Sequence, residues 1–125
     1  MQRILSILFF CILGSTAHAV PLLCNGQTPF WSLTLDENAQ TADLDWIGEI
    51  DIKADIALTA LALGDAEIKA HSLTQLSQGF TAIALVAPQN CSLKDQTEGT
   101  HRIELLTQSG NEAVLLTGCC SEFPQ

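Results

Sequence analysis

The chain has 125 residues, and its 5 Lys and Arg residues against 14 Asp and Glu residues give a formal net charge of −9. Hydrophobic residues make up 47% and charged residues 15%, which is enough apolar material for one folded core in a chain of single-domain length. So few basic residues cannot neutralise a row of phosphates, and the acidic surface repels nucleic acid, so a nucleic-acid-binding function is excluded.

The first 19 residues have the pattern of a secretory signal peptide. Arg3 precedes an apolar run over residues 4–13, and small residues follow at Ala17 and Ala19. The run is about half of the ~20 residues that a membrane-spanning helix needs, and no second long run follows, so we expect no transmembrane anchor after cleavage. Cleavage after Ala19 would release an exported chain of residues 20–125, with 4 basic and 14 acidic residues and a net charge of −10.

Beyond Val20 the apolar pattern has a period of two, which is typical of β-strands. Residues 30–35 alternate after Pro29, and residues 42–52 alternate between mostly apolar and mostly acidic positions. Gly48 lies in the middle of the second run and allows either a bent strand or a tight pair of strands. Further runs cover residues 56–63, 67–73, 80–86, 102–107 and 113–117, and turn residues separate them at 64–65, 78–79, 88–90, 98–99 and 109–111.

This spacing predicts an all-β domain: a small antiparallel barrel or sandwich of about seven to eight strands over residues 20–125, stapled by disulfides. A closed barrel would also leave no exposed sheet edge. The ambiguous segment is Ala54 to Leu63, because its alanines and leucines suit a short helix as well as a strand.

Four cysteines remain after signal cleavage, and two disulfides are expected in an exported chain. A bond between the neighbours Cys119 and Cys120 would strain the peptide between them. If these two residues lie in a strand they face opposite sides, so each needs its own partner, Cys24 or Cys91. We favour Cys91 with Cys119 and Cys24 with Cys120, because the first pair closes the shorter loop, although the opposite-face argument alone permits either pairing.

The segments Cys24-Asn25-Gly26-Gln27-Thr28-Pro29-Phe30-Trp31 and Leu115-Leu116-Thr117-Gly118-Cys119-Cys120, with Cys91 between them, carry a family resemblance. The chain resembles a family of uncharacterised exported and membrane-associated bacterial proteins with a Pro-Phe-Trp opening and a Gly-Cys ending. The resemblance spans nearly the whole exported chain. It implies a bacterial envelope location, periplasmic or secreted, and a bridge between Cys91 and Cys119, but no activity.

Candidate binding residues gather near the opening motif. Phe30 and Trp31 are neighbours in a predicted strand, so one faces the core and the other faces outward. An outward Trp31 beside Asn25 and Gln27 would anchor a ligand or a protein partner, and His101 is a further candidate. We favour the alternative, in which Trp31 packs over the barrel end, because large aromatic side chains mostly fill cores.

An acidic row on the second predicted strand offers another surface. Such a row could bind a basic protein or calcium, but carboxylates at alternate positions are ordinarily the solvated face of a half-buried strand. Trp46 on the opposite, apolar face is predicted to belong to the core. The row consists of Asp43, Asp45, Glu49 and Asp51, with Asp55 beyond it.

No hydrolase, zinc-protease or phosphate-loop motif occurs in the sequence. We therefore expect a non-catalytic envelope binding or interaction module without a cofactor or metal, in which an unknown protein, a basic one favoured, or a small envelope ligand is the partner. Inhibition of an attacking enzyme would be one such role. The alternative is a small periplasmic hydrolase or metal-binding protein, with a site near His101, Asp95 and Glu98 and the thiols of Cys119 and Cys120.

Overall fold

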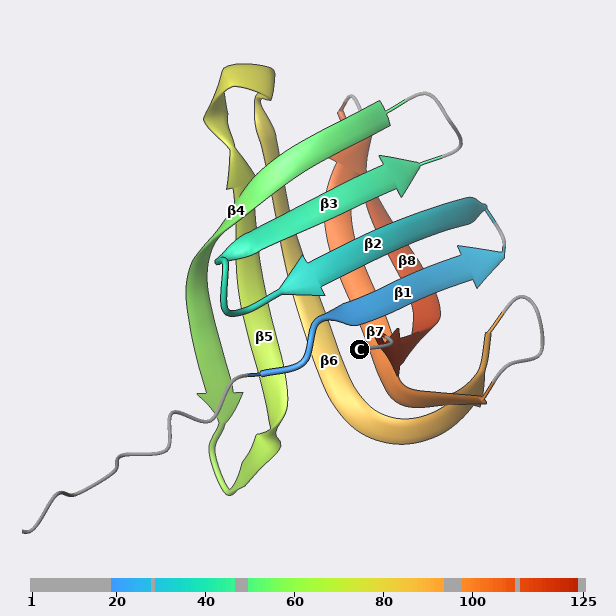
Figure 1. Cartoon of the computed structure of the whole chain (residues 1–125). Coiled ribbons are helices and arrows are strands. Elements are labelled where there is room, and N and C mark those ends of the chain that lie inside the picture. Colours follow the sequence, from blue (N-terminus) through green and yellow to red (C-terminus); the bar gives the residue numbers. More distant parts are fainter. Residues whose placement is uncertain (1–18, 28, 47–49, 94–97, 110, 124–125) are drawn as a thin grey trace, which may run out of the picture.

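The computed structural model describes residues 19–27, 29–46, 50–93, 98–109 and 111–123, and these form a closed antiparallel barrel (Figure 1). Each strand pairs with the next along the chain, and β8 returns to pair with β1. The predicted all-β, disulfide-stapled barrel is therefore confirmed. The elements are β1 (Leu22–Gln27), β2 (Phe30–Asp36), β3 (Thr41–Trp46), β4 (Ile50–Ala62), β5 (Asp65–Gln75), the 3-10 turn η1 (Leu76–Gln78), β6 (Phe80–Ser92), β7 (Glu98–Ser109) and β8 (Glu112–Glu122).

The ambiguous segment 54–63 is strand and not helix as far as Ala62, where β4 ends. Ala54 and Ile56 point inward and are buried, and the ladder to β5 shifts register between Ile56 and Leu58. The shift makes Ala57 the extra residue of a bulge, which turns Thr59 to the inner side opposite His71. Burial against the neighbouring strands outweighs the local helix preference here.

Three expectations about individual segments change. The turn predicted at 88–90 is wrong, because β6 continues to Ser92. Pro88 lies at a register shift of the β6–β7 ladder, where the N–H that proline lacks is not needed for a ladder hydrogen bond. Glu98 and Gly99, also predicted to turn, pair with β6 in the first part of β7. Strand β1 was not predicted, since its polar residues hide the alternation. Gly48 and Glu49 lie outside the described residues.

The barrel interior is filled by alternate residues of all eight strands. The large side chains that are fully buried include Trp31, Leu33, Leu35, Leu44, Leu73, Ile103, Leu105 and Leu116. Two glycines make space for the indole of Trp31: a Cβ on Gly26 would lie 2.2 Å from its Nε1, and a Cβ on Gly118 would lie 2.8 Å from its Cζ2. The barrel is a packed core, and any binding site must lie at its ends or on its outer wall.

Two disulfides join Cys24 to Cys120 and Cys91 to Cys119, which is the pairing we favoured. Cys24 and Cys120 are fully buried and face each other across the β1–β8 ladder, where the barrel closes. The second bridge ties the extended end of β6 to β8, and a Cβ on Gly99 would lie 2.1 Å from the Sγ of Cys119. Two disulfides are compatible with an oxidising, exported environment. Within the described residues, no helix has the length and apolar character needed to span a membrane.

Candidate functional site

A pocket of about 180 Å³ lies at the barrel end where β1 begins and β2 ends. In Figure 1 the segment leading into β1 crosses in front of β5 at this end, and the β4–β5 hairpin extends past it. The walls come from six segments that are far apart in the sequence. The lining residues are Ala19, Val20, Leu22, Leu35, Glu37, Glu67, Lys69, His71, Val86, His101 and Glu122.

The polar groups of the pocket reach it because β5 alternates inward at Leu73, His71 and Lys69. Leu73 is completely buried, and His71, one layer nearer the barrel mouth, is only 1% exposed. Lys69 is the next inward residue and is partly exposed. The inner face of β5 thus changes from apolar core to charged mouth within four residues.

His71 is held from both ring nitrogens. Its Nδ1 lies 2.9 Å from the hydroxyl oxygen of Thr59, and its Nε2 lies 3.4 Å from a carboxylate oxygen of Glu37. Burial lowers the pKa of His71 and Lys69 lowers it further, while the Glu37 carboxylate acts in the opposite direction. We therefore assign a neutral ring that accepts from the Thr59 hydroxyl at Nδ1 and carries its proton on Nε2, toward Glu37.

Glu37 and Lys69 form an ion pair at the pocket wall, with the Lys69 Nζ 3.1 Å from both carboxylate oxygens. Glu37 comes from the β2–β3 turn, which is fixed by Asp36: its side chain accepts from the backbone N–H groups of Asn38 at 3.0 Å and Ala39 at 3.1 Å. Because the pair is partly solvated, it adds only about 0.5 kcal/mol to stability. Its main effect is to fix where the two charges lie.

The same turn also holds the segment that enters β1. The Ala19 N–H donates to the Asn38 side-chain oxygen at 3.2 Å, and the Asn38 side-chain amide donates back to the Ala19 carbonyl. Ala19 and Val20 both line the pocket, so the predicted cleavage bond lies in its wall. Cleavage there would place the α-ammonium group of Val20 beside the pocket.

The pocket wall is amphipathic and negatively charged. Leu22, Leu35 and Val86 provide apolar surface, whereas three carboxylates, those of Glu37, Glu67 and Glu122, face one Lys side chain. His71 is neutral, so it adds no positive charge. An engineered cavity of about 150 Å³ holds one benzene molecule, so this pocket suits a ligand of similar size.

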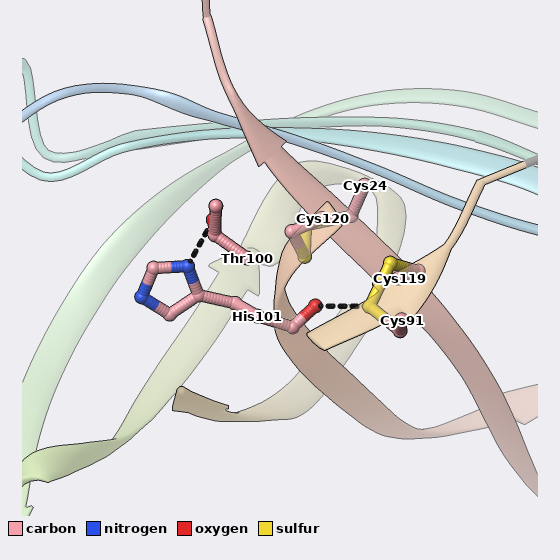
Figure 2. Close-up of a disulfide and its surroundings, with 6 residues drawn as sticks. All are labelled: Cys24, Cys91, Thr100, His101, Cys119 and Cys120. Carbon is pink, nitrogen blue, oxygen red and sulfur yellow. Dashed lines mark hydrogen bonds between the residues drawn. A yellow bond between two sulfur atoms is a disulfide. The ribbon is translucent and has the colours of Figure 1, made fainter. Parts of the chain in front are cut away.

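Of the predicted site residues that the structure describes, His101 alone lines this pocket. Its Nδ1 lies 2.7 Å from the Thr100 hydroxyl, and Figure 2 shows the ring pointing away from the bridge between Cys91 and Cys119. The His101 carbonyl oxygen lies 3.1 Å from the Cys91 Sγ, a polar contact rather than a hydrogen bond, because a disulfide sulfur carries no proton.

Trp31, the candidate anchor of a binding site, does not face outward. Trp31 is 1% exposed and fills the core, as in the favoured alternative, while Phe30 faces outward. Asn25 pairs with Cys119 in the β1–β8 ladder, and Gln27 is exposed at the end of β1 farthest from the pocket. These residues do not converge with His101.

The alternative site near His101 loses its thiols, because Cys119 and Cys120 are both in disulfides. Asp95 lies outside the described residues, and Glu98 is paired with Ser92 in the β6–β7 ladder. Where the structure describes the chain, no three His, Cys, Asp or Glu side chains lie close enough together to hold a metal ion.

The acidic row forms an exposed outer face on β3 and β4, comprising Asp43, Asp45, Asp51 and Asp55. Partial burial raises the pKa of Asp43, and the hydrogen bond to Asp51 and its charge raise it further. The indole of Trp46 packs against the core on the other side, as predicted, and its Nε1 is buried without a partner among the described residues.

Sequence reasoning missed Glu37, Lys69 and His71 as a group. One signal in the sequence could have indicated the site. In the run 67–73, the residues on the same face as Leu73 are Glu67, Lys69 and His71, whereas the inward face of a barrel strand is ordinarily apolar. No protein-family model, curated protein or solved structure matches the chain.

Proposed function

We propose that the protein is an exported, non-catalytic binding module that takes a small ligand carrying a protonated amine into the mouth of its barrel. The observation that carries this proposal is the 180 Å³ pocket, in which the buried His71 is oriented by Thr59 and Glu37. Small-molecule sites typically combine apolar walls with a few fixed polar groups, and barrel mouths are a usual place for them.

The charge of the lining supports an amine. Three carboxylates outnumber the single Lys69 cation, and they would still outnumber it after cleavage adds an ammonium group at Val20. An ammonium group placed near Glu67 and Glu122 would gain two counter-charges, while its apolar body would lie against Leu22 and Val86. A lysine side chain of a basic protein presents the same ammonium group. The pocket would therefore also accept a lysine of the basic protein partner that the acidic composition leads us to expect.

The test is a titration of the exported protein, residues 20–125, followed by two-dimensional NMR. Benzylamine is the probe and benzyl alcohol its uncharged control of the same shape. We expect benzylamine to shift the signals of His71, Lys69 and His101, with a Kd of about 1 mM, as befits a fragment-sized ligand. Nα-acetyl-lysine amide in a third titration tests whether a protein lysine is accepted.

Strand β8 offers a matched pair of variants, because it carries one glutamate at each end. Glu122 lines the pocket, whereas Glu112 lies at the opposite end of the barrel. Glu122→Gln should weaken benzylamine binding about threefold to tenfold, and Glu112→Gln should leave it unchanged. Equal binding of amine and alcohol, or equal effects of the two variants, would refute the amine assignment.

A further inference from the structure

The outer wall of the barrel carries an apolar row that runs across five strands. Cross-strand partners follow one another from Leu58 to Ser72, Ile83, Leu106 and Leu115. Four of these five are large hydrophobic residues, and their side chains are between 48% and 67% exposed. Leu85, 41% exposed, extends the row on β6. The row spans four inter-strand spacings, about 19 Å.

A patch of this kind is unusual on an isolated soluble domain. Single exposed leucines are common, but contiguous exposed apolar patches mark interaction surfaces. A groove of about 350 Å³ lies within the row, lined by its members Ser72, Ile83 and Leu106 and by Thr81. The face therefore has both an exposed leucine outside the groove, Leu115, and a hollow that can receive an apolar side chain.

The charges of the molecule are arranged around this row. The outward residues of β5 (66–74), β6 (81–87) and β8 (113–119) are uncharged. On β7 the outward charges are Glu98, at the start of the strand, and Arg102 and Glu104, whose Nε and Oε1 atoms lie 3.6 Å apart. The acidic row lies on β3 and β4, four and three strands from β7 in the closed order of eight, and so mostly on the other side of the barrel; Asp55 is its member nearest to Leu58 in the sequence.

We propose that the apolar row is the contact surface for a second copy of this chain, in a symmetric dimer with β7 near the two-fold axis. Two copies that each carry a net charge of about −10 repel each other in most orientations. Contact through the β7 side puts the two acidic faces at the far ends of the pair, where repulsion is weakest and screened by salt. An isologous contact also lets Leu115 of each copy enter the groove of the other.

The row has five large exposed side chains, those of Leu58, Ile83, Leu85, Leu106 and Leu115, against about 20–30 residues a side in a standard interface, so the dimer is concentration-dependent. The pocket lies at the end of the barrel and the row lies on its wall, and they share no lining residue. The dimer and the ligand site are therefore independent proposals, and the failure of one leaves the other unaffected.

Sedimentation velocity of the exported protein tests the dimer, from about 10 µM to about 1 mM and at low and high salt. We expect the average mass to rise with concentration, and to rise more at high salt. Leu106→Glu and Leu115→Glu should weaken association at least about tenfold, because each buries a like charge beside its symmetry mate. Leu63→Glu is the matched control, since Leu63 is fully exposed at the β4–β5 turn and away from the row.

Circular dichroism is the check that each variant is folded, which the exposure of both leucines leads us to expect. A wild-type chain that remains monomeric at all concentrations would overturn the proposal, including the case in which it binds detergent micelles through this face instead. A dimer that Leu106→Glu and Leu115→Glu weaken no more than Leu63→Glu does would overturn it as well.

Discussion

Removing the two disulfides one at a time should cost different amounts of stability, in an order set by the loops they close. The bridge between Cys24 and Cys120 joins residues 96 positions apart, and the bridge between Cys91 and Cys119 joins residues 28 apart. A cross-link stabilises the folded chain mainly by restricting the unfolded one, and the restriction grows with the logarithm of loop length.

The magnitudes follow from that relation. The shorter loop contributes about 3.6 kcal/mol at 25 °C and the longer one about 4.7 kcal/mol. Each variant keeps one bridge alone, so the expected difference in stability between the two variants is about 1.1 kcal/mol, or roughly 6 °C in Tm for a domain of this size. Each loss is a large share of the 5–15 kcal/mol that a typical domain has in total. Cys24 and Cys120 are also the more deeply buried pair, which adds to the cost of replacing them.

The assay is urea unfolding followed by circular dichroism, with the double variants Cys24→Ala/Cys120→Ala and Cys91→Ala/Cys119→Ala. Intact mass after thiol alkylation under non-reducing conditions verifies that the remaining bridge has formed. Loss of the bridge between Cys24 and Cys120 should lower the free energy of unfolding more. An equal or larger decrease on loss of the bridge between Cys91 and Cys119 would refute the loop argument and show that this link between β6 and β8 stabilises the folded state directly.

Two further predictions concern pH. Because the folded-state pKa of His71 lies below the ordinary value near 6.5, the unfolded chain binds more protons, so stability should fall as pH drops below about 6.5 and through the folded pKa. In His71→Gln this fall should be smaller by up to about 1.4 kcal/mol per pH unit, measured by urea unfolding at several pH values; identical slopes would contradict the assignment of a neutral buried ring. Asp43 has a raised pKa, so its ionised form is disfavoured in the folded state; because the side chain is exposed and solvent screens its charge, Asp43→Asn should stabilise the chain by only about 0.5 kcal/mol at pH 7. That gain should vanish below about pH 3, where Asp43 is protonated in both states, and a gain independent of pH would show that charge is not its cause.

Much of the secondary structure was available from the sequence, because strand alternation is a local property. Residues 42–46 alternate strictly enough to fix which side chains face inward, and the structure buries Ala42 and Leu44. Residues 82–86 are apolar on both faces, so the sequence there predicts a strand but not which face is buried. The adjacency of Cys119 and Cys120 likewise required two different partners. Segment 54–63 was not decidable in this way, because only the packing of Ala54 and Ile56 against neighbouring strands makes it a strand.

The sequence by itself therefore determined the all-β class, the two-bridge framework and the acidic outer face, all of which depend on residue type and spacing within short segments. The tertiary structure alone decided the pocket and the apolar row. Closing the barrel pairs β8 with β1 and so brings Glu122 to the same mouth as His71, while the register of β4 to β8 aligns Leu58, Ile83 and Leu106. Which residues meet across strands depends on pairings between distant parts of the chain, and no local pattern encodes those pairings.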